Sequence, residues 1–140
     1  MANKPAPLRL RLAMTCAVMD LLHTGHINLF ERMRERADLV LVLLHDGFTT
    51  FKNKKKLPIE NLQKRTRNLI DSGLVDIIKY TFEEQPDFTN ILKQYEQFDI
   101  TFYRGDDWQA FPGKESLKET PIVYLPYTKG ISSTILRNEL

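Results

Sequence analysis

The feature that most constrains the fold is a regular alternation of short apolar runs with amphipathic segments. The run LVLVLL (39–44) is uninterrupted and too short for an independent helix, which is typical of a strand buried on both faces of a sheet. Other apolar runs follow at intervals that leave room for helices of roughly 10–15 residues between them. This alternation predicts a parallel, doubly wound α/β sheet.

The same alternation assigns strands and helices along the whole chain. The expected strands are residues 8–19, 39–44, 75–81, 99–104 and 121–127. The expected helices are residues 27–38, 59–72 (with Gly73 as its stop), 86–98, a short one within 109–119, and 131–140. Residues 46–58 are polar and basic and are expected to form a loop. We therefore expect a single domain over residues 1–140, with about five strands and flanking helices.

Composition narrows the classes of partner. The 140 residues carry 20 basic and 18 acidic side chains, a net charge of +2, so broad binding of nucleic acid or of a membrane surface by charge alone is not expected. No apolar run reaches the ~18 residues of a membrane span. A single cysteine, Cys16, excludes an intramolecular disulfide and is typical of a reducing compartment. We expect a cytoplasmic protein with no nucleic-acid partner and no membrane partner.

Four polar segments follow predicted strands: DLLHTGH (20–26), DGFTTFKNKKK (46–56), RGDDW (104–108) and PYTKGISST (126–134). In a parallel sheet the carboxyl ends of the strands meet at one edge, where ligands bind at the point at which the strand order switches direction. The sequence therefore predicts one site, built from these four loops.

The segment DLLHTGH places two imidazoles at a helix start. Gly25 permits a tight turn, and the first helical N–H groups attract an anion. His23 and His26 are three residues apart, so both lie on one side of a first helical turn. A phosphate site is one interpretation. A histidine cap with a surface histidine, or a pair of metal ligands, are the alternatives.

The other loops are less specific. The lysines of KNKKK, Lys52 and Lys54 to Lys56, are either a solvated surface run or a clamp over phosphates. Asp106 and Asp107 either cap a helix or hold a metal ion or a ribose hydroxyl. Ser132, Ser133 and Thr134 exceed what a helix cap requires and indicate a second phosphate cradle.

These pieces, in this order, resemble the cytidylyltransferase family of nucleotidyltransferases. HTGH is similar to the family's HxGH signature, GISST to its second signature (RTEGIST or similar), and RGDDW to a GDDW segment of its members. The resemblance spans residues 12–137. It implies a Rossmann-like fold, a homodimer, Mg²⁺, and transfer of CMP from CTP to a phosphorylated alcohol with release of pyrophosphate and no covalent enzyme intermediate.

The resemblance also implies roles for matching residues. His23 and His26 stabilise the transition state at the α-phosphate, Lys54 neutralises the nucleotide phosphates, and Lys52 reaches the acceptor phosphate. Ser132 to Thr134 bind the β- and γ-phosphates. The remaining nucleotide contacts that it implies are Val18, Met19, Asp20, Thr24, Gly25, Asp107, Thr128, Gly130 and Ile131.

Three positions depart from the family pattern. Ala17 stands where the family has glycine, Tyr127 replaces the arginine of RTEGIST, and Gly73 replaces an arginine before the third strand. Lys129, Arg104 or Arg137 could compensate for Tyr127, and Arg65 and Arg67 could serve in place of the arginine at Gly73.

Two alternatives to a cytidylyltransferase follow from these observations. One is an adenylyltransferase that uses ATP, because HxGH also serves ATP-using relatives. The other is a nucleotide-binding module that has lost catalysis, motivated by the three departures. Pyrophosphate release with CTP or ATP distinguishes all three.

Overall fold

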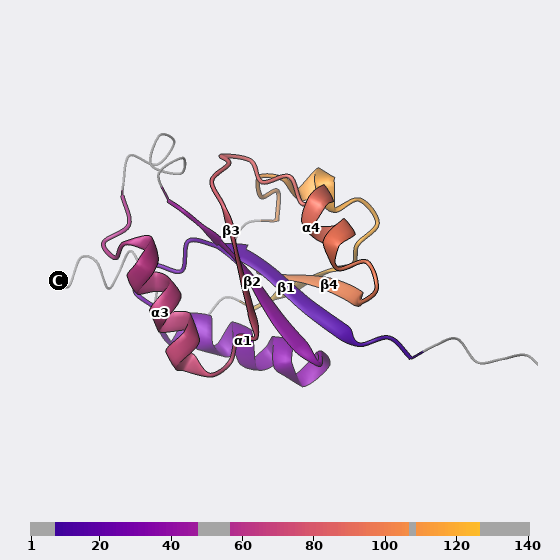
Figure 1. The fold of residues 1–140 in the computed structure, drawn as a ribbon, viewed down its shortest axis with the longest axis horizontal. Coiled ribbons are helices and arrows are strands. Elements are labelled where there is room, and N and C mark those ends of the chain that lie inside the picture. The colour runs from indigo at the N-terminus through magenta and orange to yellow at the C-terminus, as the bar shows by residue number, and fades with distance from the viewer. Residues whose placement is uncertain (1–7, 48–56, 107–108, 127–140) are drawn as a thin grey trace, which may run out of the picture.

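A computed structural model describes residues 8–47, 57–106 and 109–126, and it is drawn in Figure 1. The five strands among these residues form one parallel sheet in the order β3-β2-β1-β4-β5. They are β1 (Arg11–Ala17), β2 (Leu39–His45), β3 (Ile77–Thr81), β4 (Asp99–Gly105) and β5 (Ile122–Leu125). The predicted doubly wound parallel sheet is confirmed.

Helices cover both faces of this sheet (Figure 1). α1 (Thr24–Arg36) and α3 (Leu62–Ser72) pack on one face, where Phe30, Met33 and Leu69 join Val40, Val42 and Leu44 of β2 in one buried cluster. α4 (Thr89–Gln94) and a short 3-10 helix, η1 (Lys114–Leu117), pack on the other. Ile91 and Leu117 there contact the cluster that contains Phe102 of β4.

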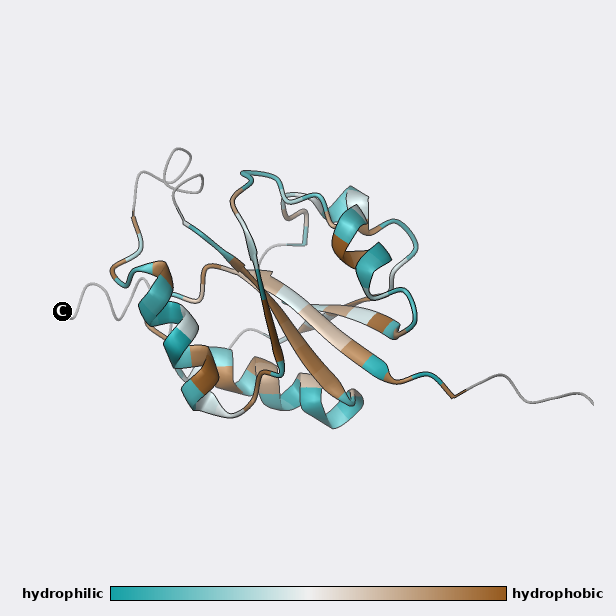
Figure 2. Ribbon diagram, in the orientation of Figure 1, coloured by the Kyte–Doolittle hydropathy of each residue, from teal (hydrophilic) through white to brown (hydrophobic). Residues whose placement is uncertain are grey.

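The hydropathy pattern explains this layering. The central strands are apolar along their length, whereas the helices carry apolar residues on the face turned to the sheet (Figure 2). Along β2, Val40 to Leu44 are at most 6% exposed, as the run LVLVLL predicts. A strand with neither face in water needs this composition, and it therefore occupies the interior of the sheet.

Chain order reverses between β1 and β4. The chain runs outward from β1 through β2 to β3, then crosses the sheet by way of α4 and returns to β4 on the other side of β1. The register places Ala17 beside Leu44 of β2, and Met14 beside Phe102 of β4. The carboxyl ends of β1 and β4 therefore form the switch point at which such sheets bind ligands.

Several predicted elements are correct in type and too long. The first strand begins at Arg11 and ends at Ala17, because Met19 and Leu21 adopt positive φ angles of 56° and 51°. α3 begins at Leu62 rather than at residue 59, because Asn61 caps it and accepts a hydrogen bond from the Lys64 N–H at 2.8 Å.

The other boundaries differ in both directions. α1 begins at Thr24, before the expected residue 27, and β2 and β4 run on to His45 and Gly105, just past their expected ends. α4 covers only Thr89–Gln94 of the expected 86–98, and residues 109–119 hold the 3-10 helix. Gly73 ends α3 as expected, with φ 70° and its N–H bonded to Ile70 O. The expected helix at 131–140 lies outside the described residues. No helix in the described part of the chain is long and apolar enough to cross a membrane.

Candidate active site

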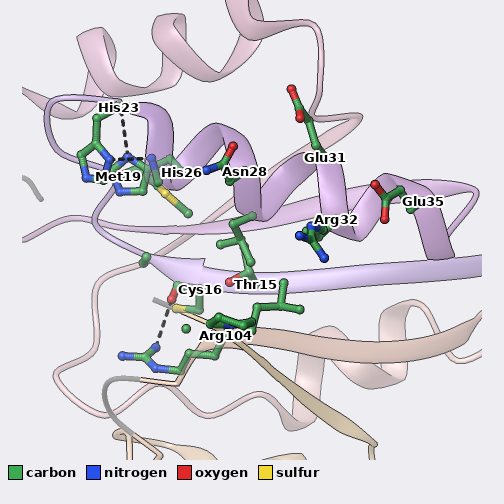
Figure 3. Close-up of a pocket in the computed structure, with 16 residues that line it drawn as sticks. Thr15, Cys16, Met19, His23, His26, Asn28, Glu31, Arg32, Glu35 and Arg104 are labelled. Carbon is green, nitrogen blue, oxygen red and sulfur yellow. Dashed lines mark hydrogen bonds between the residues drawn. The ribbon is translucent and has the colours of Figure 1, made fainter. Parts of the chain in front are cut away.

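A cavity of about 550 Å³ opens at the carboxyl ends of β1 and β4 and extends along α1 (Figure 3). Its walls are Thr15 to Ala17 of β1, one side of α1, the end of β4, and Leu125 with Pro126 after β5. Met19, His23, Gly25 and His26 line its upper end. The predicted convergence on one site is thus observed for the turn after β1 and for the carboxyl ends of β4 and β5.

The two histidines form the start of α1. His23 is the N-cap, and its Nδ1 accepts a hydrogen bond from the Gly25 N–H at 3.0 Å. His26 Nδ1 accepts from the His23 N–H at 3.2 Å, so the two residues cap the helix reciprocally (Figure 3). The alternative of a histidine cap with a surface histidine is therefore correct only for the cap: His23 caps the helix, whereas His26 is half-buried and lines the cavity.

The caps settle the protonation of both rings. A nitrogen that accepts a hydrogen bond carries no proton, so each neutral ring holds its proton on Nε2. The pKa of His26 is lowered to about 3, chiefly by burial and also by the neighbouring His23, while Asp20 opposes the shift. Burial also lowers the pKa of His23. Near neutral pH the cavity therefore contains two N–H donors rather than two imidazolium cations.

Cys16 lines the same cavity but is not a nucleophile. Its side chain is 7% exposed, and burial raises the pKa of the thiol to about 12, against the opposing charge of Arg104. The thiolate is the reactive form of cysteine, so the thiol is inert near neutral pH. This agrees with a reaction that forms no covalent enzyme intermediate.

The segment before the histidines has a structural role that sequence reasoning did not assign. The Asp20 carboxylate accepts hydrogen bonds from the N–H groups of Ile59 at 2.9 Å and Glu60 at 3.0 Å, and its side chain is 3% exposed. Asp20 is not among the described residues that line the cavity. The structure thus joins it to the start of α3.

Of the other four residues expected to contact the nucleotide in this turn, two line the cavity and two do not. Met19 and Gly25 line the cavity, as their expected roles require. Thr24 is exposed on the first turn of α1, and the Val18 carbonyl accepts a hydrogen bond from Arg65.

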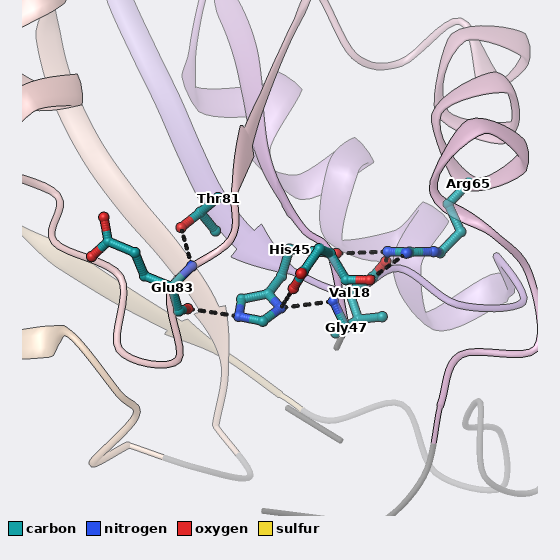
Figure 4. Close-up of polar contacts among 7 residues, drawn as sticks. Val18, His45, Gly47, Arg65, Thr81 and Glu83 are labelled. Atoms are coloured by element: carbon teal, nitrogen blue, oxygen red, sulfur yellow. Dashed lines mark hydrogen bonds and ion pairs between the residues drawn. The ribbon is translucent and has the colours of Figure 1, made fainter. Parts of the chain in front are cut away.

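The structure gives Arg65 a role that the sequence did not suggest. As a possible substitute for the arginine missing at Gly73, Arg65 would have had to reach a phosphate. Instead it is 2% exposed, and its guanidinium donates to four backbone carbonyls, with distances of 2.6–3.0 Å: Glu60 O, Val18 O, His45 O and Asp46 O. Figure 4 shows the Arg65 side chain directed toward Val18 and His45. These bonds tie the ends of β1 and β2 to α3. Arg67, on the same helix, is exposed.

His45 also serves the backbone. Its Nδ1 accepts from the Gly47 N–H at 3.0 Å, and its Nε2 lies 2.8 Å from Glu83 O (Figure 4). The Nδ1 atom also lies 3.3 Å from Asp46 Oδ1. These contacts with the backbone of Gly47 and Glu83 fix the turn after β2.

Arg104 supplies a cation at the opposite wall of the cavity from the histidines. Its guanidinium carbon lies 4.6 Å from the centre of the Phe111 ring, and its Nη1 lies 3.4 Å from Cys16 O. Figure 3 shows this side chain across β1 from His23 and His26. A stacked guanidinium keeps its planar fork oriented, which suits it to a phosphate or a carbonyl.

Sequence reasoning missed the part of the cavity along α1. Asn28, Arg32 and Glu35 line it. They follow Gly25 at intervals of three and four residues, which is the spacing of one helix face, so the signal was present. It was hidden because charged residues on a surface helix usually face water.

Several expected site residues lie outside the described part of the chain: Lys52, Lys54, Asp107, Thr128, Gly130, Ile131, Ser132, Ser133 and Thr134. Their roles stay predictions. Among the described residues, no group of three or more His, Cys, Asp and Glu side chains could hold a metal ion. The Mg²⁺ implied by the resemblance stays a prediction.

Comparison with known proteins agrees with this geometry. The model of the family described as cytidylyltransferase-like matches residues 14–139. Glycerol-3-phosphate cytidylyltransferase of Bacillus subtilis (strain 168) is 33% identical over 137 residues, which cover 94% of this chain and 98% of the relative. The enzyme of the same name from Staphylococcus aureus (strain NCTC 8325 / PS 47) is 32% identical over 137 residues, covering 94% and 96%.

Solved structures share the fold at lower identity. The lipopolysaccharide core biosynthesis protein of Thermoplasma volcanium GSS1 matches with a TM-score of 0.68 and 22% identity over 86% of this chain and 99% of that one. Pantothenate synthetase of Thermus thermophilus matches with a TM-score of 0.58 and 16% identity, over 93% and 62%. The family model that matches residues 14–139 and the relatives of 33% and 32% identity show that the chain belongs to the cytidylyltransferase-like family of nucleotidyltransferases.

Proposed function

We propose that this protein transfers CMP from CTP to a phosphorylated alcohol, glycerol 3-phosphate or a related polyol phosphate. A phosphate oxygen of the acceptor bonds to the α-phosphorus of CTP, the bond from that phosphorus to the bridging oxygen breaks, and pyrophosphate leaves with that bond's electrons. The product is a CDP-alcohol. Support comes from the family membership and from relatives named glycerol-3-phosphate cytidylyltransferase that span nearly the whole chain.

The observation that carries the proposal is the reciprocal cap of His23 and His26. Each ring uses Nδ1 to accept a backbone N–H, so the proton of each neutral ring is on Nε2. Both residues line the cavity at the end of β1. Two fixed donors beside a helix N-terminus stabilise charge that develops on the oxygens of a reacting phosphate, and they need no reorganisation when it develops.

The other parts of the proposal rest on the resemblance. We propose that Lys54 and Ser132 to Thr134 bind the nucleotide phosphates and that Lys52 binds the acceptor. We also propose that Asp107 contacts the nucleotide. Mg²⁺ would arrive on the triphosphate, because it keeps its waters and binds phosphates more readily than an all-protein cage. A homodimer and a cytoplasmic location are further parts of this proposal.

The test is pyrophosphate release in the presence of Mg²⁺, with CTP and ATP each crossed against a panel of phosphorylated alcohols that includes glycerol 3-phosphate. Turnover with CTP and one acceptor is the expected result and names the product. Turnover with ATP alone would replace the proposal with an adenylyltransferase. Binding of CTP without turnover on any acceptor would indicate a module that has lost catalysis.

A further inference from the structure

The turn between β1 and α1 contains two residues in an unfavourable backbone conformation. Met19 has φ 56° and Leu21 has φ 51°, and neither is glycine. The left-handed region brings the Cβ atom too close to the backbone carbonyl, so bulky side chains rarely occupy it. Such a conformation persists only where neighbouring groups hold it. His23 follows Leu21 by two residues, so this conformation determines where α1 begins.

A carboxylate from another part of the chain holds this turn. Glu60 Oε1 accepts the Leu21 N–H at 2.8 Å. Asn68 Nδ2, on α3, donates to the same carboxylate at 3.2 Å and 3.1 Å and fixes its orientation. In return, Asp20 accepts the backbone N–H groups of Ile59 and Glu60. The two segments are thus joined by carboxylate bonds in both directions, across 39 residues of sequence.

We propose that Glu60 is a positioning residue for the two histidines. Its carboxylate holds Leu21 in the left-handed conformation, and that conformation sets His23 as the N-cap, so that both imidazoles face the cavity. The effect on turnover rests on the proposed function, whereas the effect on the imidazoles does not. Glu60 lies outside the described residues that line the cavity, and it acts only through Leu21.

The decisive experiment is a rescue by glycine. Glu60→Ala removes the acceptor of the Leu21 N–H, and we expect kcat to fall on the order of 10-fold to 100-fold, with KM for CTP changed much less, because misplaced groups lose transition-state contacts first. Leu21→Gly in the same chain should restore most of kcat, because glycine adopts a positive φ without assistance. A double variant as slow as Glu60→Ala alone would overturn the proposal.

Matched variants separate the hydrogen bond from the charge. Glu60→Gln keeps an acceptor oxygen for Leu21 and should retain most of kcat, while its Asn68 partner can turn its amide to match. Glu60→Asp, shorter by one methylene, should lose the bond with less risk to folding than alanine. A fall in kcat with Glu60→Gln as large as that with Glu60→Ala would show that charge, not position, is what matters.

Nuclear magnetic resonance of the imidazole nitrogens provides a readout without turnover. In the unligated wild-type protein, His23 and His26 should each show a proton on Nε2 and a bare Nδ1. Glu60→Ala should mix the two tautomers, and Leu21→Gly should return the wild-type pattern. If the wild-type protein released no pyrophosphate, the proposed function would fail, and these spectra would still decide the role of Glu60. An unchanged pattern in Glu60→Ala would refute it.

Discussion

The imidazole rings of His23 and His26 lie stacked, with their centroids 3.9 Å apart and their planes inclined by 26°. Two imidazolium ions at this distance would repel each other strongly, and burial adds to the cost of charging either one. The stacking therefore agrees with the backbone hydrogen bonds at both Nδ1 atoms, which already require neutral rings. Near neutral pH the start of α1 therefore holds two oriented imidazole donors and no imidazolium cation.

The pH dependence of the free energy of unfolding should show whether His26 is neutral in the folded protein. The pKa of His26 is about 3 in the folded protein and has its ordinary value of 6.5 in the unfolded chain. Between these values the unfolded state binds a proton that the folded state does not, so the free energy of unfolding rises with pH, by up to about 1.4 kcal/mol per pH unit. The contribution is complete above pH 6.5 and is lost as the pH falls toward 3. His23, whose pKa is also lowered, adds in the same direction.

The variant His26→Asn isolates this effect. Asparagine keeps an acceptor for the His23 N–H but does not titrate, so the slope of unfolding free energy against pH should become shallower. Urea unfolding between about pH 4.5 and 6.5 measures it, above the range in which most carboxylates titrate. Equal slopes in the variant and the wild type would mean that His26 is protonated in the folded protein.

The proposed catalytic role of His23 is tested by a substitution that preserves its structural role as the N-cap of α1. Asparagine is a favoured N-cap, so His23→Asn should leave the stability of the protein within about 1 kcal/mol of wild type. It lacks the Nε2 donor, and we expect kcat to fall by about 10²-fold to 10³-fold, as for other lost transition-state donors. Pyrophosphate release at saturating substrate measures the fall in kcat.

The matched control is His45→Asn, which alters a buried histidine outside the cavity lining. It should lower stability and leave kcat within about threefold of wild type, whereas a similar loss of kcat in both variants would point to a folding defect.

Arg104 is expected to bind a substrate anion from the wall opposite the histidines. A charge-assisted hydrogen bond is worth about 1.5 kcal/mol or more, so Arg104→Gln should raise KM for at least one substrate by roughly tenfold. Arg104→Lys keeps the charge but loses the planar fork, so its KM should lie between the values of the wild type and Arg104→Gln. Steady-state kinetics with CTP and the acceptor varied separately identifies which substrate it contacts. Unchanged KM values for both would assign the side chain to packing against Phe111 alone.

The parts of the molecule that sequence reasoning predicted are those with a local signal. LVLVLL indicates a buried strand because every residue needed for the inference is adjacent. HTGH indicates a helix start with two imidazoles for the same reason. Glu60 and Arg65 carried no such signal, because their partners Leu21 and Val18 lie 39 and 47 residues away in the sequence. A polar residue that serves distant backbone groups looks like any surface residue until the fold brings the partners together.

Asp20 and Arg65 show, near the site itself, that sequence alone does not reveal contacts with distant backbone groups. Asp20 stands in a motif, and its expected contact with the nucleotide stays a prediction; the structure adds hydrogen bonds from its carboxylate to the N–H groups of Ile59 and Glu60. Arg65 was a candidate to compensate for a missing phosphate contact, yet it binds carbonyls. In both cases the residue type suits a ligand and a buried backbone group equally well. Only the three-dimensional position distinguishes the two.

Arg65 and Arg67 provide a matched pair for the last prediction. Arg65→Met fills much of the same volume but leaves four carbonyls at the ends of β1, β2 and the start of α3 without their donor. Each buried unsatisfied group costs about 1–3 kcal/mol, so we expect a loss of roughly 3–5 kcal/mol in the free energy of unfolding. Arg67→Met changes an exposed side chain on the same helix and should cost less than about 0.5 kcal/mol. Urea midpoints with a common m-value measure the difference, and a similar small shift in both variants would mean that water replaces the guanidinium at these carbonyls.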